Sequence, residues 1–420
     1  MPNGPKLPSL AGADWLTAEP TCKVFAAFRA AGVEARAVGG VVRNALMGLP
    51  VTDIDIATPA VPDDVMRLAR DAGLGVAETG LKHGTVTVIA DHHPFEVTTL
   101  RIDKETHGRN ATVSFTTDWE ADARRRDFTM NALYCDADGT VYDPLGGAGD
   151  LLARRVRFIG DARARIREDY LRILRFFRFT AQYADGRPDM EGTHACVIER
   201  KGLARLSAER IHQELMRLLA APHASAAVRA MQAWGILAEV LPAAPRPALL
   251  ERLVAIEASQ GLGPDSVARL AMLAVETDED AMRLAARFRM SGAERAGLRL
   301  AALPEARLHS APDAREARGM LYRAPEPAYR RLLLMCWTRA LDAPADDGSW
   351  AHALLLPQRW TVPVLPVNGG DAMARGVPPG PVLGETLKAL EAWWIANNFT
   401  PTREQLLKRL DEMVQSRGSS

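Results

Sequence analysis

The sequence predicts an α+β fold, in which a small mixed β-sheet with helices forms an N-terminal head and an elongated all-α remainder follows. Three observations lead to this prediction. Helical and strand-like patterns alternate from residue 21 to residue 150. The turn sequence DPLGG at residues 143–147 is typical of a hinge. After the hinge the apolar spacing is helical only, so the remainder is expected to be helical.

The head is expected to follow a loose N-terminal arm. Residues 1–20 contain four prolines and form this arm, and the head then occupies residues 21–150. Its expected elements are, in order, a helix (21–31), a strand (35–38), a short helix (42–47), a strand through Asp53 and Asp55, a helix (63–72) and two β-rich runs (85–89 and 95–100).

The helical remainder is expected to contain a basic neck and two further segments. Between residues 151 and 217 there are 15 Lys and Arg against 9 Asp and Glu, so this part carries an excess of positive charge. The expected segments are a neck (151–221), a body (222–345) and a tail (346–420), and the tail ends in a helix pair (381–397 and 402–414).

The composition is that of an ordinary soluble protein of several domains. The chain has 420 residues, 47% of them apolar and 25% charged. A net charge of zero argues against a basic coat for nucleic acid over the whole surface but allows a local basic face. Four scattered cysteines predict neither a zinc site nor a disulfide framework, and they fit the cytoplasm. We expect no signal peptide and no membrane span.

Asp53 and Asp55 are the most informative pair of residues. They lie two residues apart in the strand-like sequence DIDIAT, and the period of a strand places both carboxylates on one face. Two adjacent anions without a cation nearby in the sequence need a positive partner. Mg²⁺ fits, because it binds carboxylate oxygens together with substrate phosphates. The alternative is a solvated strand end, which is common for Asp-x-Asp.

A glycine pair lies upstream of the two aspartates. Gly39 and Gly40 end an apolar run and precede a short helix that carries Arg43. Glycines let the backbone approach a ligand closely, and a guanidinium binds phosphate oxygens. Together with the aspartates, these residues predict a site that handles a nucleoside triphosphate.

Several motifs together indicate a family. The Gly-Gly…Asp-x-Asp pattern resembles the catalytic signature of the nucleotidyltransferase superfamily. The motifs that follow are TGLKHGTVTV (79–88), DARRRDFTMNAL (122–133), DPLGGAGDL (143–151), REDYLRILRFFRF (167–179) and SAERIHQEL (207–215). In this order and spacing they resemble those of class II tRNA nucleotidyltransferases and bacterial poly(A) polymerases, and the first is similar to the form found in CCA-adding members.

The resemblance implies a reaction that uses two Mg²⁺ ions. Asp53 and Asp55 would bind both ions, one of which activates an RNA 3′-hydroxyl while the other stabilises the leaving pyrophosphate. Glu96, in the strand-like sequence PFEVTTL, is a candidate third catalytic carboxylate, and the alternative is an exposed strand glutamate. The triphosphate would be held by Gly39, Gly40 and Arg43.

The motif DARRRDFTMNAL is expected to bind ribose and phosphate. Asp127 and Asn131 are four residues apart, so on a helix both would reach the same sugar hydroxyl. Arg125 and Arg126 would pair with phosphate oxygens. The alternative is a structural helix start, with Asp127 as its cap or as an ion-pair partner.

The motif REDYLRILRFFRF is expected to recognise the base. Asp169 and Arg172 lie three residues apart on one helix face and offer an acceptor beside a donor. Cytosine and adenine each present an amino donor beside a ring-nitrogen acceptor, whereas uracil and guanine do not match. Glu168 is expected to orient Arg172, and Arg175 and Arg178 are candidates for RNA binding. The alternative is an ordinary surface ion pair.

Residues 101–119 are expected to form a loop, because they lack a clear periodicity. In CCA-adding enzymes such a flexible loop helps the base site to switch from C to A, with Asp103 and Arg109 as candidates here. The alternative is a plain surface connection. Ser207 is expected to cap the next helix, and Arg210 is then structural rather than catalytic.

One position departs from the family pattern. The family usually has Arg-Asp after the glycine pair, whereas Arg43 is followed here by Asn44. Asparagine keeps the ability to form hydrogen bonds but lacks the charge. This departure puts in question any ion pair that anchors the short helix, but not the metal site.

The resemblance implies a cytoplasmic, Mg²⁺-dependent enzyme that adds C, C and A to the 3′ end of tRNA from CTP and ATP without a template. The basic neck and the tail would hold tRNA by backbone charge and shape. Neither a membrane nor an obligate protein partner is expected. Two alternatives remain open: an A-adding relative such as a poly(A) polymerase, and a non-catalytic tRNA-binding protein.

Overall fold

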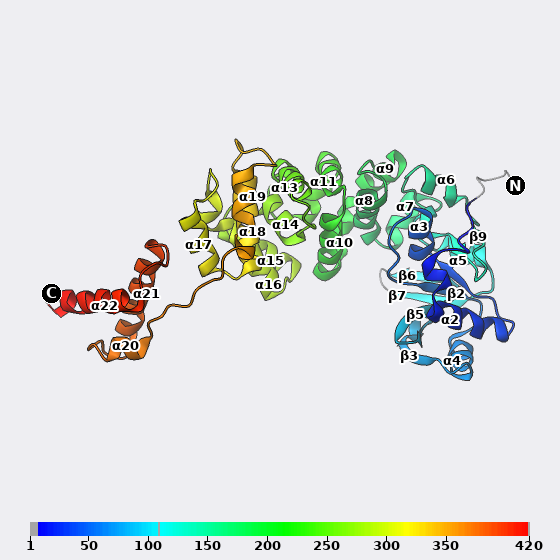
Figure 1. Cartoon of the computed structure of the whole chain (residues 1–420). Helices are drawn as coiled ribbons and strands as arrows, with labels where there is room; N and C mark the ends of the chain where they lie inside the picture. The colour runs from blue at the N-terminus through cyan, green and yellow to red at the C-terminus, as the bar shows by residue number, and fades with distance from the viewer. Residues whose placement is uncertain (1–6, 108–109, 419–420) are drawn as a thin grey trace. The chain divides into compact units, whose positions relative to one another are not determined.

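The computed structural model describes residues 7–107 and 110–418. The chain divides into two compact units, residues 1–242 and residues 243–420, whose elements are labelled in Figure 1. Within the described ranges, all strands belong to the first unit and the second unit is helical. The predicted α+β fold, with a mixed sheet followed by helices, is confirmed.

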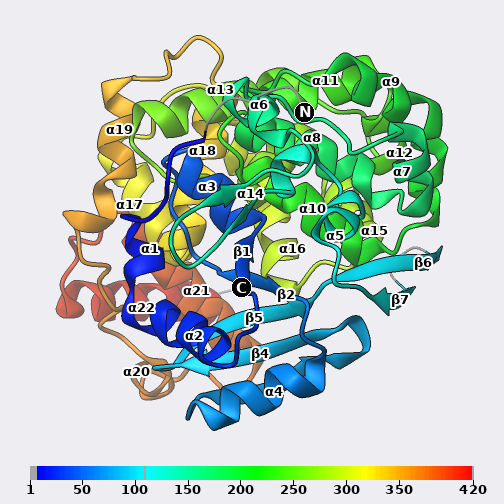
Figure 2. The same ribbon diagram turned by 90° about the vertical axis from the view of Figure 1, so that its right-hand side faces the viewer.

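The head is built on one mixed sheet of seven strands. Their order is β3-β4-β5-β2-β1-β8-β9, and only β2 and β5 are parallel neighbours. The helices α2 and α4 pack against β4, as Figure 2 shows. The strands are β1 (Arg36–Val38), β2 (Asp55–Thr58), β3 (Gly75–Gly80), β4 (Thr85–Ala90), β5 (His93–Thr99), β8 (Tyr134–Cys135) and β9 (Val141–Tyr142).

The helices of the first unit surround this sheet and continue beyond it. In the continuation, α8 packs against both α10 and α11. The helices are α1 (Asp14–Thr17), α2 (Glu19–Ala30), α3 (Gly40–Leu46), α4 (Pro62–Asp71), α5 (Trp119–Arg124), α6 (Gly147–Leu152), α7 (Ala162–Glu168), α8 (Leu171–Tyr183), α9 (Met190–Glu199), α10 (Ala208–Ala220), α11 (Ala224–Ala233) and α12 (Leu237–Val240).

An aromatic cluster joins the head to α8. The ring of Phe128, in the head, lies 5.0 Å from the rings of both Phe158 and Phe179, and Phe158 stacks on Phe176 at 5.4 Å. Phe128 and Phe176 are fully buried. Burying such large apolar rings is strongly favourable. The cluster therefore fixes α8 against the segment that follows α5.

Two segments differ from the expectations of the sequence. The segment expected to be a loose arm contacts the head, because the backbone N–H of Leu10 and the hydroxyl of Ser9 both donate to the carbonyl of Gly139. Residues 101–119 do not form a plain loop, because β6 (Arg101–His107) and β7 (Asn110–Phe115) pair as an antiparallel hairpin. Charged residues hid the alternation of this hairpin in the sequence.

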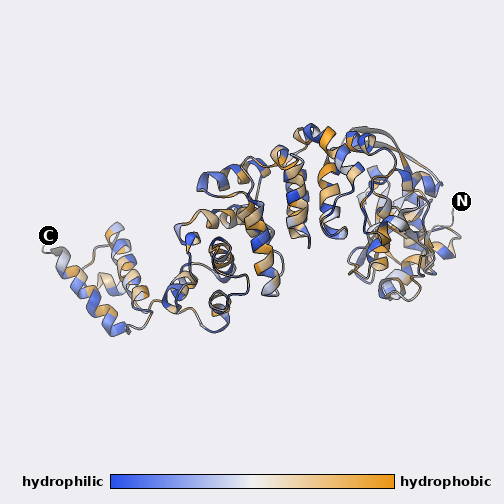
Figure 3. Cartoon of the chain, turned by 90° about the horizontal axis from the view of Figure 1, so that it is seen from above, coloured by the Kyte–Doolittle hydropathy of each residue, from blue (hydrophilic) through white to orange (hydrophobic). Residues whose placement is uncertain are grey.

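The second unit is a set of packed helices. Apolar and polar residues alternate along the helices of both units (Figure 3). No helix in the described part of the chain is long and apolar enough to cross a membrane. The helices are α13 (Pro247–Ser259), α14 (Ser266–Ala274), α15 (Asp278–Phe288), α16 (Gly292–Arg299), α17 (Ala314–Arg323), α18 (Glu326–Arg339), α19 (Gly348–Leu354), α20 (Gly369–Met373), α21 (Pro381–Ala396) and α22 (Arg403–Gly418).

Candidate active site

A cleft of about 580 Å³ in the first unit brings most of the predicted site residues together. Six arginines and three aspartates line it, so its charge suits an anion. The predicted residues outside this lining are Asp53, Glu96, Arg125 and Glu168. The lining residues are Gly39, Gly40, Arg43, Asp55, Arg126, Asp127, Asn131, Asp169, Leu171, Arg172, Arg175, Arg178, Phe179 and Arg210.

The glycine pair forms a tight turn between β1 and α3. Gly39 has a φ of +73°, a conformation that residues with a side chain rarely adopt. A Cβ atom there would lie 3.5 Å from Nη1 of Arg126, an ordinary contact distance, so the backbone conformation alone restricts this position. The turn therefore requires glycine, and it presents bare backbone to the cleft next to a guanidinium.

The carboxylates of β2 and β5 lie side by side and are exposed. Asp55 is the first residue of β2 and is in register with Glu96 on the parallel strand β5. Partial desolvation by the surrounding protein and the negative charges of Glu96 and Asp53 raise the pKa of Asp55, although Arg126 opposes this. The expectation that both aspartates belong to the strand is wrong for Asp53, which precedes β2.

This group of carboxylates fits a divalent cation. Partial desolvation first, and then the neighbouring acids, disfavour the charge of Asp55, and a positive ion beside these acids would stabilise it. Among the described residues, no three His, Cys, Asp or Glu side chains are arranged as a complete metal site. Mg²⁺ commonly completes its coordination with water and substrate phosphates, so one or two carboxylates suit it.

One buried carboxylate holds the two arginines that follow α5. Asp122 accepts hydrogen bonds from Nε of Arg125 (2.7 Å), from Nη2 of Arg126 (3.1 Å) and from the hydroxyl of Tyr134 (2.9 Å). Burial opposes its charge, but Arg126 and Arg125 keep the pKa of Asp122 below its usual value. The sequence prediction gave Asp122 no role, although its spacing of three and four residues from the arginines would have revealed these pairs.

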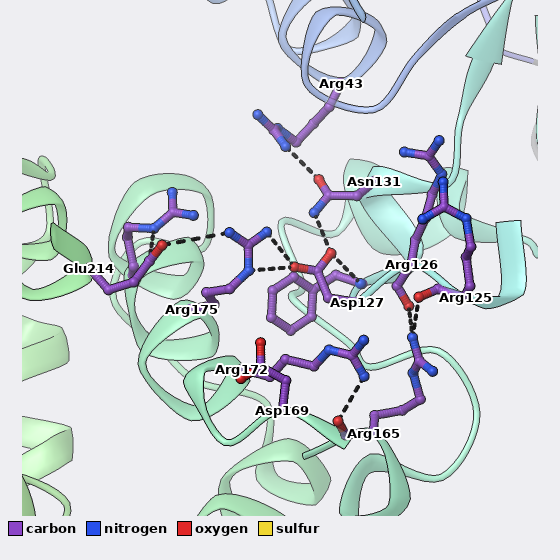
Figure 4. Close-up of polar contacts among 12 residues, drawn as sticks. Arg43, Arg125, Arg126, Asp127, Asn131, Arg165, Asp169, Arg172, Arg175 and Glu214 are labelled. Atoms are coloured by element: carbon purple, nitrogen blue, oxygen red, sulfur yellow. Dashed lines mark hydrogen bonds and ion pairs between the residues drawn. The ribbon is translucent and has the colours of Figure 1, made fainter. Parts of the chain in front are cut away.

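Asp127 is the centre of a second buried network, drawn in Figure 4. One carboxylate oxygen accepts from Nδ2 of Asn131 (2.9 Å), and the other accepts from Nε (2.8 Å) and Nη2 (2.6 Å) of Arg175. Although burial opposes the charge, Arg175 and Asn131 hold the pKa of Asp127 well below its usual range. Asp127 and Asn131 thus lie side by side, but the α-helix that they were expected to share does not exist, because Asn131 ends the 3-10 helix η2 (Thr129–Asn131).

The residues expected to read the base lie at a break between α7 and α8. Asp169 is extended, with a φ of −153°, so the expectation that Asp169 and Arg172 share one helix face is wrong. Nη1 of Arg172 donates to Glu168 (2.5 Å) and to the carbonyl of Arg165 (2.7 Å). Asp169 pairs instead with Arg210 of α10, at 2.6 Å. Both Asp169 and Arg172 nevertheless line the cleft.

Glu214 of α10 forms ion pairs with two arginines of α8. Arg172, Arg175 and Arg178 recur every three residues, which places them along one side of α8. The buried Glu214 accepts from Nε of Arg178 at 2.5 Å, and one of its oxygens lies 3.6 Å from Arg175. Neither Glu214 nor the pairing of Arg210 could be recognised from the sequence, because their partners lie more than thirty residues away.

The two candidate residues of the segment 101–119, Asp103 and Arg109, cannot be compared with the prediction. Arg109 is outside the described residues, and the structure describes the backbone of Asp103 but not its side chain. The capping prediction for Ser207 is confirmed, because its side chain accepts from the N–H of Arg210.

Two family models match parts of the first unit, with one match extending just into the second. The poly A polymerase head domain matches residues 35–157, which include the glycine turn and both aspartates. A probable RNA- and SrmB-binding site of polymerase A matches residues 198–246.

Relatives match nearly the whole chain. The chain is 35% identical over 385 residues to CCA tRNA nucleotidyltransferase 1, mitochondrial, of Mus musculus, which spans 89% of this chain and 86% of the relative. It is 33% identical over 388 residues to the CCA-adding enzyme of Latilactobacillus sakei, which spans 90% of this chain and 94% of the relative. The chain belongs to the CCA tRNA nucleotidyltransferase family.

The fold agrees with this CCA tRNA nucleotidyltransferase assignment. The crystal structure of the Bacillus stearothermophilus CCA-adding enzyme in complex with CTP matches with a TM-score of 0.75 and 26% identity, over 96% of this chain and 98% of that chain. The predicted family and the predicted enzyme class, nucleotidyltransferase, are confirmed. In this CCA tRNA nucleotidyltransferase, the glycine turn, Asp55 and the arginines of α8 are gathered around one cleft.

Proposed function

We propose that this chain adds C, C and A to the 3′ end of tRNA from CTP and ATP, with release of pyrophosphate. One observation carries the proposal: a single cleft is lined by the exposed carboxylate of Asp55, by a series of arginines, and by the pair expected to read the base. A triphosphate in this cleft would lie between acids that favour a metal ion and guanidiniums that favour phosphate.

The arginines and the glycine turn would bind the triphosphate. Arg126 lies beside the turn at Gly39 and is held by Asp122, so its direction is set before a nucleotide enters. Despite its burial, Asp122 keeps the pKa of Arg126 above its usual value, so Arg126 stays charged at any physiological pH. Asp127 and Asn131 would orient the ribose, because their polar atoms line the same cleft.

Asp53, Asp55 and Glu96 would hold Mg²⁺. When bound, two such ions activate the 3′-hydroxyl of the RNA and stabilise the charge of the leaving pyrophosphate. The carboxylates of this chain would set the position of the ions at the start of β2. The register of Asp55 with Glu96 on a parallel strand favours a shared site for these two acids.

Asp169 and Arg172 would select the base. Nη1 of Arg172 donates to Glu168 and to the carbonyl of Arg165. Its Nε and Nη2 make no hydrogen bond to any of the described residues. Glu168 therefore fixes the guanidinium while leaving donors for a ring nitrogen. Asp169 would accept from the amino group of cytosine or adenine. A base that reversed this pattern would leave buried polar groups unpaired.

The RNA would be held outside the cleft by charge and shape. The basic neck and the segment matched to an RNA-binding site of polymerase A, residues 198–246, support tRNA as the partner. All four cysteines are free, which is compatible with the cytoplasm, although the mouse and human relatives are named mitochondrial.

The activity can be tested with a tRNA that ends before CCA. We expect two additions with CTP alone and a third only when ATP is also present. Long runs of A with ATP alone would instead identify a poly(A) polymerase, and no addition under any condition would overturn the proposal.

The same assay tests which residues carry the reaction. The double variant Asp53→Ala/Asp55→Ala is expected to add nothing. Asp63→Ala/Asp64→Ala removes the same charge from the first turn of α4 and serves as the matched control, with activity expected within about twofold. Activity that survives in the first double variant would contradict the mechanism.

A further inference from the structure

Arg43 is a buried cation whose hydrogen-bond partners are all neutral. Only 6% of the residue is exposed. Nε and Nη2 donate to Oδ1 of Asn44 (3.2 and 3.0 Å), Nη1 donates to Oδ1 of Asn131, and Nη2 also donates to the hydroxyl of Tyr183 (2.7 Å). Four of the five N–H donors are thereby engaged. No carboxylate in the described part of the chain forms an ion pair with Arg43.

Tyr183 compensates this charge in two ways. Its hydroxyl accepts a hydrogen bond, and its ring centroid lies only 4.1 Å from the guanidinium carbon of Arg43. The face of an aromatic ring attracts a cation, most strongly where water is excluded, and Tyr183 is only 7% exposed. A second ring, that of Phe179, lies 5.2 Å from the same carbon.

The position after Arg43 explains why this compensation is needed. That residue is Asn44, which is neutral, whereas an aspartate there would supply a full negative charge. Oδ1 of Asn44 accepts from Arg43, and its Nδ2 donates to the carbonyl of Pro50. Asparagine thus keeps the geometry of a side-chain acceptor but leaves the charge to be stabilised by other groups.

The contacts of Arg43 close a ring around the cleft. From Arg43 the ring runs through Asn131 to Asp127 and on to Arg175 of α8. It returns along α8 to Tyr183, which contacts Arg43 again. The glycine turn at the start of α3 is therefore tied to α8 at two points, one of them Tyr183 (the first part of the ring is visible in Figure 4).

We infer that Tyr183 is a positioning residue for nucleotide transfer, which holds the triphosphate turn in register with the base-reading helix through Arg43. The inference rests on the proposed function, in which the glycine turn binds the triphosphate and α8 binds the base. Opening the ring at the hydroxyl of Tyr183 leaves Arg43 hydrogen-bonded to α8 only through the side chains of Asn131, Asp127 and Arg175, beside its contacts with the aromatic rings of α8. The distance between the turn that binds the triphosphate and the helix that binds the base would then no longer be fixed.

The test is a double-mutant cycle between Tyr183→Phe and Asn44→Asp. Tyr183→Phe removes one hydroxyl and keeps the ring. We expect it to raise the KM for CTP and for ATP about fivefold to tenfold, because one hydrogen bond to a charged group is lost, and to leave the affinity for tRNA unchanged. In the Asn44→Asp background the carboxylate pairs with Arg43, so the same substitution should change either KM by less than about twofold.

A matched control distinguishes positioning from a general loss of stability. Tyr329 in the second unit is also buried, and its hydroxyl donates to the carbonyl of Ala353 at the same 2.7 Å distance. Tyr329→Phe should lower the thermal unfolding temperature by an amount similar to Tyr183→Phe, but it should leave both nucleotide KM values unchanged.

Two results of the KM measurements would overturn the inference. One is a KM for both nucleotides within twofold of the wild type in Tyr183→Phe. The other is an equal rise in the wild-type and Asn44→Asp backgrounds, since Tyr183 would then not act through Arg43. If Tyr183→Phe alone fails to fold, the double variant must fold and bind CTP, or the inference also fails. Absence of nucleotide addition by the wild-type enzyme would instead refute the proposed function.

Discussion

The two ends of the candidate site hold carboxylates in opposite surroundings. Around the start of β2, Asp53, Asp55 and Glu96 are exposed, and none of them forms an ion pair within the described ranges. Beside α8, Asp127 and Glu214 are buried, and each pairs with arginines. A paired acid is already neutralised and orders the protein around it. An unpaired acid in a basic cleft is available for a cation from outside.

The largest effect is expected at the unpaired end. Asp53→Asn together with Asp55→Asn should lower the rate of CTP incorporation into tRNA by at least about 10³-fold, because metal ions supply several kcal/mol of transition-state stabilisation. The thermal unfolding temperature of the protein without added metal should stay the same or rise, since the partial desolvation and the neighbouring negative charges that raise the pKa of Asp55 no longer act on a charged group. A variant that keeps a tenth of the activity, or that unfolds far more easily, would contradict the view that these acids bind metal and do not stabilise the fold.

The next largest effect is expected at the paired end, and it concerns stability. Glu214→Ala leaves the guanidinium of Arg178 without its carboxylate acceptor, whereas Arg175 keeps its hydrogen bonds to Asp127. Breaking a buried pair in this way costs about 3 kcal/mol or more of the free energy of unfolding, measured by urea denaturation of the first unit. The matched control is Asp138→Ala, which breaks the exposed pair with Arg29 and should cost less than about 1 kcal/mol. Equal costs for the two variants would contradict the distinction.

A smaller effect, on specificity, is expected from Arg172→Ala. Loss of its donors should raise the ratio of UTP to CTP incorporation about tenfold or more, because the wrong base no longer leaves a buried donor unpaired. The dissociation constant for tRNA should hardly change, and filter binding would measure it. A weakened tRNA complex with an unchanged incorporation ratio would remove Arg172 from the base site.

The smallest effect is expected from mild acid. Asp127 has a folded-state pKa below the 3.8 of a free aspartate, so its stabilising contribution is complete above that value and is lost only as the pH falls through the lower, folded pKa. Between pH 7 and pH 5 the contribution of the Asp127–Arg175 pair to the free energy of unfolding should change by less than about 0.5 kcal/mol. In Asp127→Asn this acid-dependent loss should be absent below pH 4, and its persistence would show that another group is responsible.

Local patterns in the sequence indicate the residues of the unpaired end. The glycine pair, the two aspartates and Glu96 follow from short motifs, whereas the register that places Asp55 beside Glu96 comes from the structure. The α+β division and the arginine series of α8 also follow from periodicity. The predicted start of this strand was wrong, because β2 begins at Asp55, whereas the alternation of the sequence begins at Asp53.

The paired end could not be predicted, because its partners come from distant segments. Asp127 meets Arg175, and Asp169 meets Arg210, across 48 and 41 residues respectively. The break at Asp169 also has no local pattern, since REDYLRIL reads as one continuous helix. Only tertiary packing decides that α7 ends at Glu168 and that Asp169 turns toward α10. Family resemblance supplied the residues but not these contacts.

The carboxylate of Asp122 has a thermodynamic consequence for an enzyme that works without a template. A long arginine side chain loses up to about 2 kcal/mol of rotamer entropy when a ligand immobilises it. Asp122 already restricts Arg125 and Arg126, and Tyr134 in turn donates to the same carboxylate. An incoming anion therefore meets side chains whose freedom was lost during folding. If these arginines bind the triphosphate as proposed, the folded chain itself keeps them immobile between one addition and the next, in place of a nucleic-acid strand that orders each substrate.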